Sequence, residues 1–246
     1  MNLRRPMRSL FYGIFCLLGA GGASAALVDR GGGLIYDTVL NVTWLQDANY
    51  AFTSGYNTFD YGTMNWADAN AWVAGLSYYD SVRNVSYSGW RLPVVRPING
   101  SSFVYPGAVD GSADYGYNVG APGTVYAGGT GSELAYMYFT NLGNLAYLDA
   151  TGTPQAGYGL LNPGPFINSN SVFWSGTEYA PNNIWAWSFT TYGVLSGFQD
   201  YYPKRNTFTA WAVHDGDIAN AVPEPGILAL FGICLAGLGF RKRRQR

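Results

Sequence analysis

Apolar residues recur at helical spacing in two stretches of the chain. In residues 65–77 they lie three or four apart, which places them on one helix face; they are Trp66, Ala69, Val73 and Leu76. Asn65 or Thr63 precedes them and is a typical N-cap residue. In residues 132–142 the same spacing recurs at Leu134, Met137, Tyr138 and Leu142. There Thr130 and Glu133 have capping-box spacing and Gly143 follows, so the sequence predicts a second helix.

Short apolar runs bounded by turn residues predict the strands. Two lie near the start, at 34–36 and 42–45, and four near the end, at 172–175, 184–190, 195–198 and 210–213. Between the helices, residues 94–129 are rich in Gly, Pro, Ser and Tyr, which predicts a long surface loop. Two helices with short antiparallel strands indicate an α+β domain with long loops.

Residues 1–25 have the organisation of a secretory signal peptide. Three arginines precede an apolar run at 10–20, and small residues then mark a cleavage position at Ala23, Ala25 and Ala26. We therefore expect the export machinery and signal peptidase to act on the chain, and the mature body to begin at Ala26.

Residues 219–246 combine three features in order. These are Pro223-Glu224-Pro225, an apolar run at 227–240, and a basic end at 241–246 that includes Arg241, Arg243 and Arg244. The run predicts a C-terminal transmembrane helix of about 21 Å, shorter than a hydrocarbon core of about 30 Å. The basic end is expected to stay in the cytoplasm. Temporary retention in the membrane and a permanent single-span anchor are both consistent with this segment.

This tail resembles the PEP-CTERM sorting signal of Gram-negative bacteria. The resemblance covers residues 222–246 and rests on all three parts. It implies that Pro223, Glu224 and Pro225 carry recognition by an exosortase, a membrane cysteine protease. It also implies an inner-membrane-anchored intermediate, a final place at the cell surface or in the extracellular matrix, and an association with exopolysaccharide and biofilm systems.

Charge is distributed unevenly along the chain. Residues 26–225 hold six basic and fifteen acidic side chains, a net charge of −9, although the whole chain carries only −1. Such a body repels nucleic acid and sulfated polysaccharides, but it tolerates neutral glycans, cations or basic partners.

Both cysteines lie in the terminal segments, so this body has no disulfide, thiolate metal site or cysteine nucleophile. His214, the only histidine, excludes a histidine cluster or a conventional Ser-His-Asp triad.

Aromatic residues make up 17% of the chain and include eight tryptophans, which suits a ligand-facing domain. Trp185 and Trp187 alternate with Ala186, so both face one side of the predicted strand, close to Tyr179. These three are candidates for a glycan-stacking platform, and core packing is the alternative.

Asp215 and Asp217 flank Gly216 and are candidate Ca²⁺ ligands, with a solvated turn as the alternative. Otherwise we expect no cofactor.

Other motif residues are expected to be structural. They are Trp90, Trp174 and Trp211, together with Arg91, whose guanidinium could stack on an aromatic ring and pair with a carboxylate. Nothing in the sequence brings two acids together for glycoside hydrolysis. We therefore expect a non-enzymatic protein, with a polysaccharide hydrolase as one alternative.

Several motifs in residues 27–217 resemble, in order, a domain family first named from the C-terminal part of a Legionella collagen-like adhesin. They are Leu34–Asp37, Thr43–Leu45, Trp66–Ala69, Gly89–Pro93, Gly131–Leu134, Phe173–Glu178 and Ala210–Val213 with Asp215-Gly216-Asp217. The resemblance implies a C-type-lectin-like fold related to formylglycine-generating enzymes. His214 stands where that family usually has arginine, and the paired cysteines of the enzyme branch are missing from residues 26–225.

These observations predict three parts: a signal peptide at 1–25, a C-type-lectin-like domain at 26–218 and a sorting signal at 219–246. The expected function is that of an exported, non-catalytic surface or matrix module that binds a neutral exopolysaccharide. A purely structural or protein-binding envelope component is the alternative.

Overall fold

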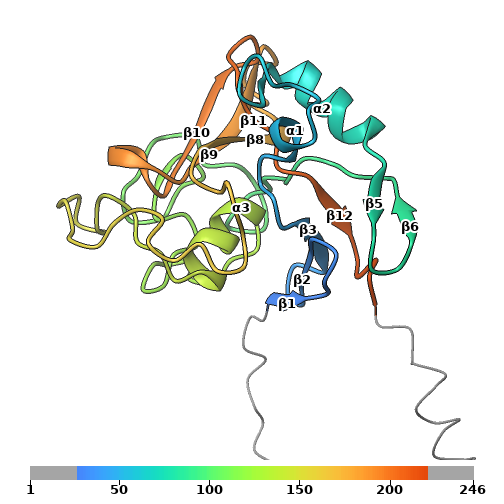
Figure 1. Ribbon diagram of the computed structural model, residues 1–246. Helices are drawn as coiled ribbons and strands as arrows, with labels where there is room; N and C mark the ends of the chain where they lie inside the picture. Colours follow the sequence, from blue (N-terminus) through green and yellow to red (C-terminus); the bar gives the residue numbers. More distant parts are fainter. Residues whose placement is uncertain (1–26, 221–246) are drawn as a thin grey trace, which may run out of the picture.

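The computed structural model describes residues 27–220, which form a mixed α+β structure made mostly of short strands (Figure 1). The strands are β1 (Leu27–Asp29), β2 (Leu34–Asp37), β3 (Val42–Leu45), β4 (Thr63–Met64), β5 (Tyr78–Asp80), β6 (Val85–Tyr87), β7 (Gly116–Tyr117), β8 (Val172–Glu178), β9 (Trp185–Thr190), β10 (Phe198–Pro203), β11 (Phe208–Thr209) and β12 (Val213–Asp215). The helices are α1 (Tyr50–Thr53), α2 (Trp66–Gly75) and α3 (Glu133–Tyr136). A π-helical turn, η1 (Met137–Asn141), continues α3, and a 3₁₀ turn, η2 (Gly193–Leu195), precedes β10.

The first and last strands belong to one antiparallel sheet. Its order is β1-β2-β3-β12, and Val213 of β12 lies opposite Trp44 of β3. The beginning and the end of the described chain therefore lie at the same end of the molecule (Figure 1).

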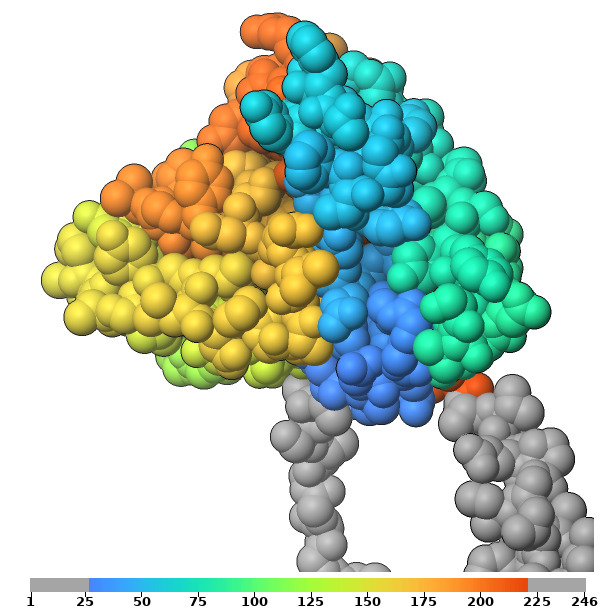
Figure 2. Space-filling model, in the orientation of Figure 1, coloured from blue at the N-terminus to red at the C-terminus, as the bar shows by residue number. Residues whose placement is uncertain are grey.

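A second sheet carries the aromatic strands. Its order is β4-β11-β8-β9-β10-β7, with β11 and β8 parallel and the other pairs antiparallel. The central pair is irregular between Trp174 and Glu178 of β8, where the register shifts. Figure 2 shows orange residues of this sheet well away from the blue residues of β1. The ends of the described chain thus belong to one sheet, whereas the aromatic strands at the far end of the molecule belong to the other.

Both predicted helices are present, and local caps explain where they begin. The Asn65 side chain accepts the Asp68 N–H at 3.0 Å at the start of α2. The Ser132 hydroxyl caps α3 by accepting the Ala135 N–H at 3.3 Å. The capping box expected from Thr130 to Glu133 was wrong, because Ser132 is the cap and the Glu133 carboxylate binds elsewhere.

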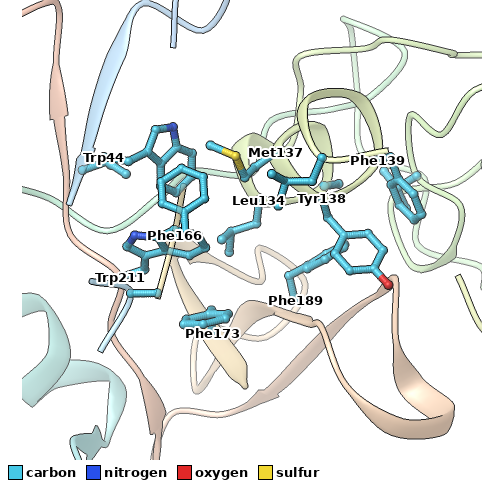
Figure 3. Packing of buried hydrophobic residues seen from close by; sticks show 14 of the residues in the cluster. Trp44, Leu134, Met137, Tyr138, Phe139, Phe166, Phe173, Phe189 and Trp211 are labelled. Atoms are coloured by element: carbon cyan, nitrogen blue, oxygen red, sulfur yellow. The ribbon is translucent and has the colours of Figure 1, made fainter. Parts of the chain in front are cut away.

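Aromatic side chains fill the space between the sheets and α3. Trp211 packs edge-on against Trp44 and Phe166, with ring centroids 4.9 Å away in both cases (Figure 3). Its indole N–H donates to the Leu45 carbonyl at 2.8 Å, so the buried ring keeps a hydrogen bond. Phe189 of β9 extends this core toward Tyr138 of η1. The main apolar core thus joins both sheets.

Residues 94–129 were predicted to be a long surface loop, and the surface position is wrong for part of this segment. It is irregular, but Ile98, Val119 and Ala121 are buried in it, and it contributes the edge strand β7. The buried Asp114 carboxylate accepts the backbone N–H groups of Ile98 and Val104, at 2.7 and 2.8 Å. These bonds satisfy donors that would otherwise be costly to bury.

Several strands differ from the prediction. Residues 195–198 lie mostly in and after the η2 turn, so β10 begins only at Phe198. Of residues 210–213, only Val213 belongs to β12. The β5–β6 hairpin was not predicted, because its strands are only three residues long and mostly exposed or partly exposed, which gives little apolar signal.

Some predicted features lie outside the described residues. These are the signal peptide, the helix at 227–240 and the basic end. Among residues 27–220, no helix has the length and apolar character needed to cross a membrane.

Candidate functional site

Aromatic side chains gather where β9 and β10 meet the 94–129 segment. We call this group the aromatic cluster; its members are Phe103, Tyr105, Tyr115, Tyr179, Trp185, Trp187, Phe198 and Tyr201. All of them are partly exposed except Trp187, which is fully buried. The cluster is therefore neither an ordinary core nor a scatter of isolated surface rings.

The predicted tryptophan pair does share one strand face. Both Trp185 and Trp187 contact Tyr201 of the neighbouring strand, with ring centroids 5.5 and 5.6 Å away. Tyr179 stacks on the same Tyr201 ring, at 3.9 Å and an interplanar angle of 23°. The structure thus brings the three sequence candidates together, with Trp187 beneath the surface and the other two at its edge.

Phe103 and Tyr105 form a cover over Trp187. Their rings lie nearly parallel to the indole, with centroid distances of 5.6 and 6.4 Å and interplanar angles of 23° and 15°. Tyr105 also meets Tyr179 edge-on at 5.0 Å. Sequence reasoning missed this cover, because residues 94–129 have no apolar periodicity to show which rings turn inward.

The cluster is electrically neutral at physiological pH. Burial raises the pKa of Tyr201 to about 12, and neighbouring Tyr179 adds to this shift. Asp200, which precedes Tyr201 in β10, has a pKa that burial raises above its ordinary value. The described ion pairs involve no residue of the cluster. Such a surface suits an uncharged ligand with apolar faces.

An open pocket lies beside the cluster. It has a volume of about 530 Å³, and its lining includes Ala108, Val109, Tyr115, Tyr117 and Phe198. Tyr115 and Phe198 belong to the aromatic cluster as well. The pocket therefore extends the aromatic surface toward β7.

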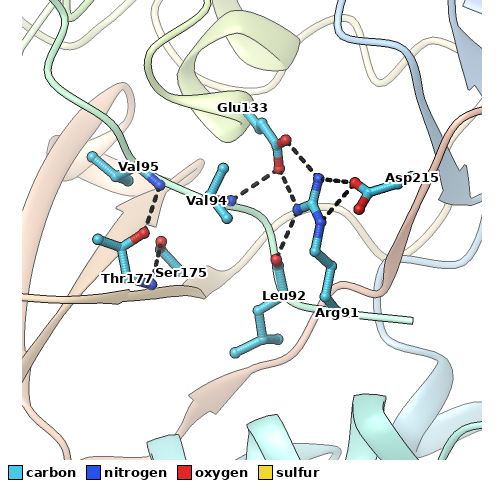
Figure 4. A network of polar contacts seen from close by, with 8 residues as sticks. All are labelled: Arg91, Leu92, Val94, Val95, Glu133, Ser175, Thr177 and Asp215. Carbon is cyan, nitrogen blue, oxygen red and sulfur yellow. Dashed lines mark hydrogen bonds and ion pairs between the residues drawn. The ribbon is translucent and has the colours of Figure 1, made fainter. Parts of the chain in front are cut away.

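Arg91 is the centre of a polar network that links three parts of the chain (Figure 4). Its two terminal nitrogens donate to both Glu133 oxygens at 2.8 Å, and Nε and Nη2 donate to Asp215 Oδ1 at 2.9 and 2.7 Å. Glu133 also accepts the Val94 N–H at 2.9 Å. Burial alone would lower the pKa of Arg91, but the Glu133 and Asp215 carboxylates raise it above its ordinary value.

This arrangement fits the structural role expected for Arg91 in part. The carboxylate pairing is present, whereas none of the cation–aromatic contacts of residues 27–220 involves Arg91. The bidentate pair with Glu133 ties the Trp90–Pro93 segment to α3, and the pair with Asp215 ties it to β12.

The two candidate calcium ligands are held apart by different arginines. Asp215 pairs with Arg91, and Asp217 pairs with Arg30, whose Nε lies 3.2 Å from Asp217 Oδ1. No group of three His, Cys, Asp or Glu side chains converges anywhere in residues 27–220. His214 bonds to the carbonyls of Ser88 and Asp215, at 3.0 and 2.7 Å.

The tryptophans expected to be structural lie in the interior. Trp90, Trp174 and Trp211 are each at most 3% exposed. The indole N–H groups of the first two donate to the carbonyls of Tyr87 and Met64, at 2.9 and 2.8 Å. All three side chains therefore have both apolar packing and a satisfied donor.

One comparison with known proteins gives a match. Residues 221–244 match the PEP-CTERM protein-sorting motif, directly after the last described residue. No curated protein and no solved structure gives a significant match. The motif supports an exported, exosortase-sorted protein that is held by its C-terminal signal before processing.

Proposed function

We propose that this protein is a non-catalytic surface or matrix component that binds a neutral exopolysaccharide through the aromatic cluster. The observation that carries the proposal is the group of partly exposed, uncharged rings around Tyr201, which includes Tyr179 and Trp185. No cofactor is part of the proposal.

The ligand class follows from surface chemistry. Flat aromatic faces pack against the C–H surfaces of sugar rings, and partly exposed tyrosine hydroxyls can hydrogen-bond sugar hydroxyls. The charge of −9 over residues 26–225 disfavours polyanions. A neutral polysaccharide meets both conditions, whereas nucleic acid and sulfated glycans do not.

The position of the cluster suits a protein tethered by its tail. β12 ends near β1, and the sorting motif begins at residue 221, whereas the cluster belongs to the other sheet (Figure 1). A chain still held in the inner membrane would keep its aromatic surface free. The joining of both chain ends in one sheet also supports a C-type-lectin-like arrangement for the body.

Binding is tested with the full chain in mild detergent on immobilised neutral polysaccharides, with and without Ca²⁺. We expect Tyr201→Ala to weaken binding about tenfold, since it removes the ring that Tyr179 and Trp185 contact. Tyr61→Ala is the matched control, because Tyr61 is 74% exposed but lies outside the cluster. Equal loss in both variants, or no binding by the unmodified chain, would overturn the proposal.

Sorting is tested separately with epitope tags on both sides of Pro223. In a host with an exosortase, the two tags should separate and the N-terminal tag should reach the cell surface or matrix. A Pro223→Ala/Glu224→Ala/Pro225→Ala variant is the control and should keep the tags together. Tags that stay together in the unmodified chain would favour a permanent anchor.

One observation favours a second candidate, a purely structural or protein-binding envelope component. Trp187 is fully buried, so this ring is not a ready-made platform. That function predicts no glycan binding by the unmodified chain, and the binding experiment separates the two.

A further inference from the structure

Two buried polar atoms without a hydrogen-bond partner lie beneath the aromatic cluster. They are Trp187 Nε1, a donor on β9, and Gln199 Oε1, an acceptor on β10. Both residues are fully buried. An unmet buried donor or acceptor costs about 1–3 kcal/mol, so each such atom calls for an explanation.

The strand register places both side chains on the same face of the sheet. Trp187 pairs with Tyr201, and Gln199 lies two residues before Tyr201 on the same strand. Residues two apart on a strand point to the same face. The donor and the acceptor are therefore neighbours on the face that the 94–129 segment covers.

Two stretches of that segment, joined by hydrogen bonds between Val104 and Asp114, cover the two residues. Phe103 and Tyr105 stack over Trp187, and Gln199 Nε2 donates to the Asp114 carbonyl at 2.7 Å. The Asp114 carboxylate in turn holds the Val104 N–H, between the two covering rings. The cover is thus held by ring contacts of Phe103 and Tyr105 and by two hydrogen bonds between Val104 and Asp114, and both of its rings are partly exposed.

We propose that Trp187 Nε1 and Gln199 Oε1 form a subsite for one hydroxyl group of a neutral sugar, which enters when Phe103 and Tyr105 move aside. A hydroxyl group accepts one hydrogen bond and donates another, so it satisfies the indole N–H and the amide oxygen together. An anion could only accept, and would leave Gln199 Oε1 unmet. This subsite rests on the proposed function and adds a specificity element to it.

The test measures binding of dextran and galactomannan oligosaccharides to the full chain in detergent. Trp187→Phe keeps a ring and removes the N–H, and Gln199→Leu removes the acceptor. We expect each variant to bind at least tenfold more weakly to the oligosaccharide that the unmodified chain prefers. Because one hydroxyl touches both groups, the double variant should lose little more than either single one.

Comparison with Tyr201→Ala separates the two proposals. If Tyr201→Ala weakens binding while Trp187→Phe and Gln199→Leu bind like the unmodified chain, the subsite is wrong and the proposed function stands. Additive losses in the double variant would also overturn a shared hydroxyl. If neither oligosaccharide binds the unmodified chain, both the subsite and its ligand class are wrong.

A measurement on the unmodified chain covers the case in which a variant does not fold. The indole ¹H–¹⁵N resonance of Trp187 should shift, and its proton should exchange more slowly, when the preferred oligosaccharide is added. The Trp90 indole, which is already bonded to the Tyr87 carbonyl, is the internal control and should not change. An unchanged Trp187 signal at saturating oligosaccharide would contradict the subsite.

Discussion

The Arg91 network and the aromatic cluster bury polar groups in different ways, although the Trp44 indole opposite β12 has no partner among residues 27–220 either. Near β12, the Trp211 indole has a carbonyl partner, and the Arg91 guanidinium has two carboxylates. In the cluster, rings contact rings, and the Trp187 indole has no partner among residues 27–220. A fully satisfied network holds one geometry, whereas unmet buried groups are costly and gain from a ligand that satisfies them.

This difference matches the position of each region in the chain. β12 is the last strand before the sorting motif, so its ion pairs fasten the end of the fold that is joined to the tail. The aromatic cluster lies on the other sheet, away from that end. We therefore read the Arg91 network as structural and the cluster as the binding surface.

The largest expected contrast is between two tryptophans. Trp211→Ala should lower the free energy of unfolding by about 4 kcal/mol, because the ring fills the core beside Trp44 and Phe166. Trp185→Ala should cost about 1 kcal/mol, because that ring is only partly buried at the edge of the cluster. Urea denaturation of both variants measures the difference. Equal losses would mean that the cluster is core.

The next contrast is between two glutamates in ion pairs. Glu133→Gln should destabilise the fold by about 3 kcal/mol, because it replaces one of the two carboxylates that pair with the partly buried Arg91 guanidinium by a neutral amide. Glu178→Gln is the matched control; it breaks an exposed pair with Lys204 and should cost under about 1 kcal/mol. Urea denaturation again gives both values. A Glu133 effect as small as the control would remove the structural reading of the Arg91 network.

The features that sequence could predict are those determined by neighbouring residues. The α2 cap at Asn65 involves a partner three residues away, and the alternation of Trp185 and Trp187 places both on one face. Glu133 shows the limit, because its carboxylate binds Arg91, 42 residues earlier, instead of closing a local capping box.

The cover of the cluster could not be predicted for the same reason. Phe103 and Tyr105 are held over Trp187 by long-range stacking, and Asp114 fastens the backbone between them. Neither contact leaves a periodic pattern in the sequence. The Gly- and Tyr-rich composition correctly indicated irregular backbone, but it could not show that this backbone is folded into the core.

The smallest expected effect is on the pH dependence of stability, which has opposite signs in the two regions. Pairing with Arg91 lowers the pKa of Asp215 below its ordinary value of 3.8, so this pair stabilises the fold above that pH and is lost as the pH falls through the lowered pKa. Because the Asp215 side chain is 77% exposed, the gain should stay under about 1 kcal/mol. Burial raises the pKa of Asp200 beside the cluster, so its contribution is complete below 3.8 and is lost as the pH rises through the raised pKa.

Urea denaturation between pH 2.5 and about 7 tests this opposition in Asp215→Asn and Asp200→Asn. Relative to the unmodified chain, Asp215→Asn should lose part of the stability that develops on going from acid to neutral pH, because the carboxylate no longer forms. Asp200→Asn should remove the decline that the buried carboxylate causes as it ionises. If the two variants gave parallel plots of unfolding free energy against pH, ionisation would affect both carboxyl groups alike. The contrast between the Arg91 network and the aromatic cluster would then not apply to their charges.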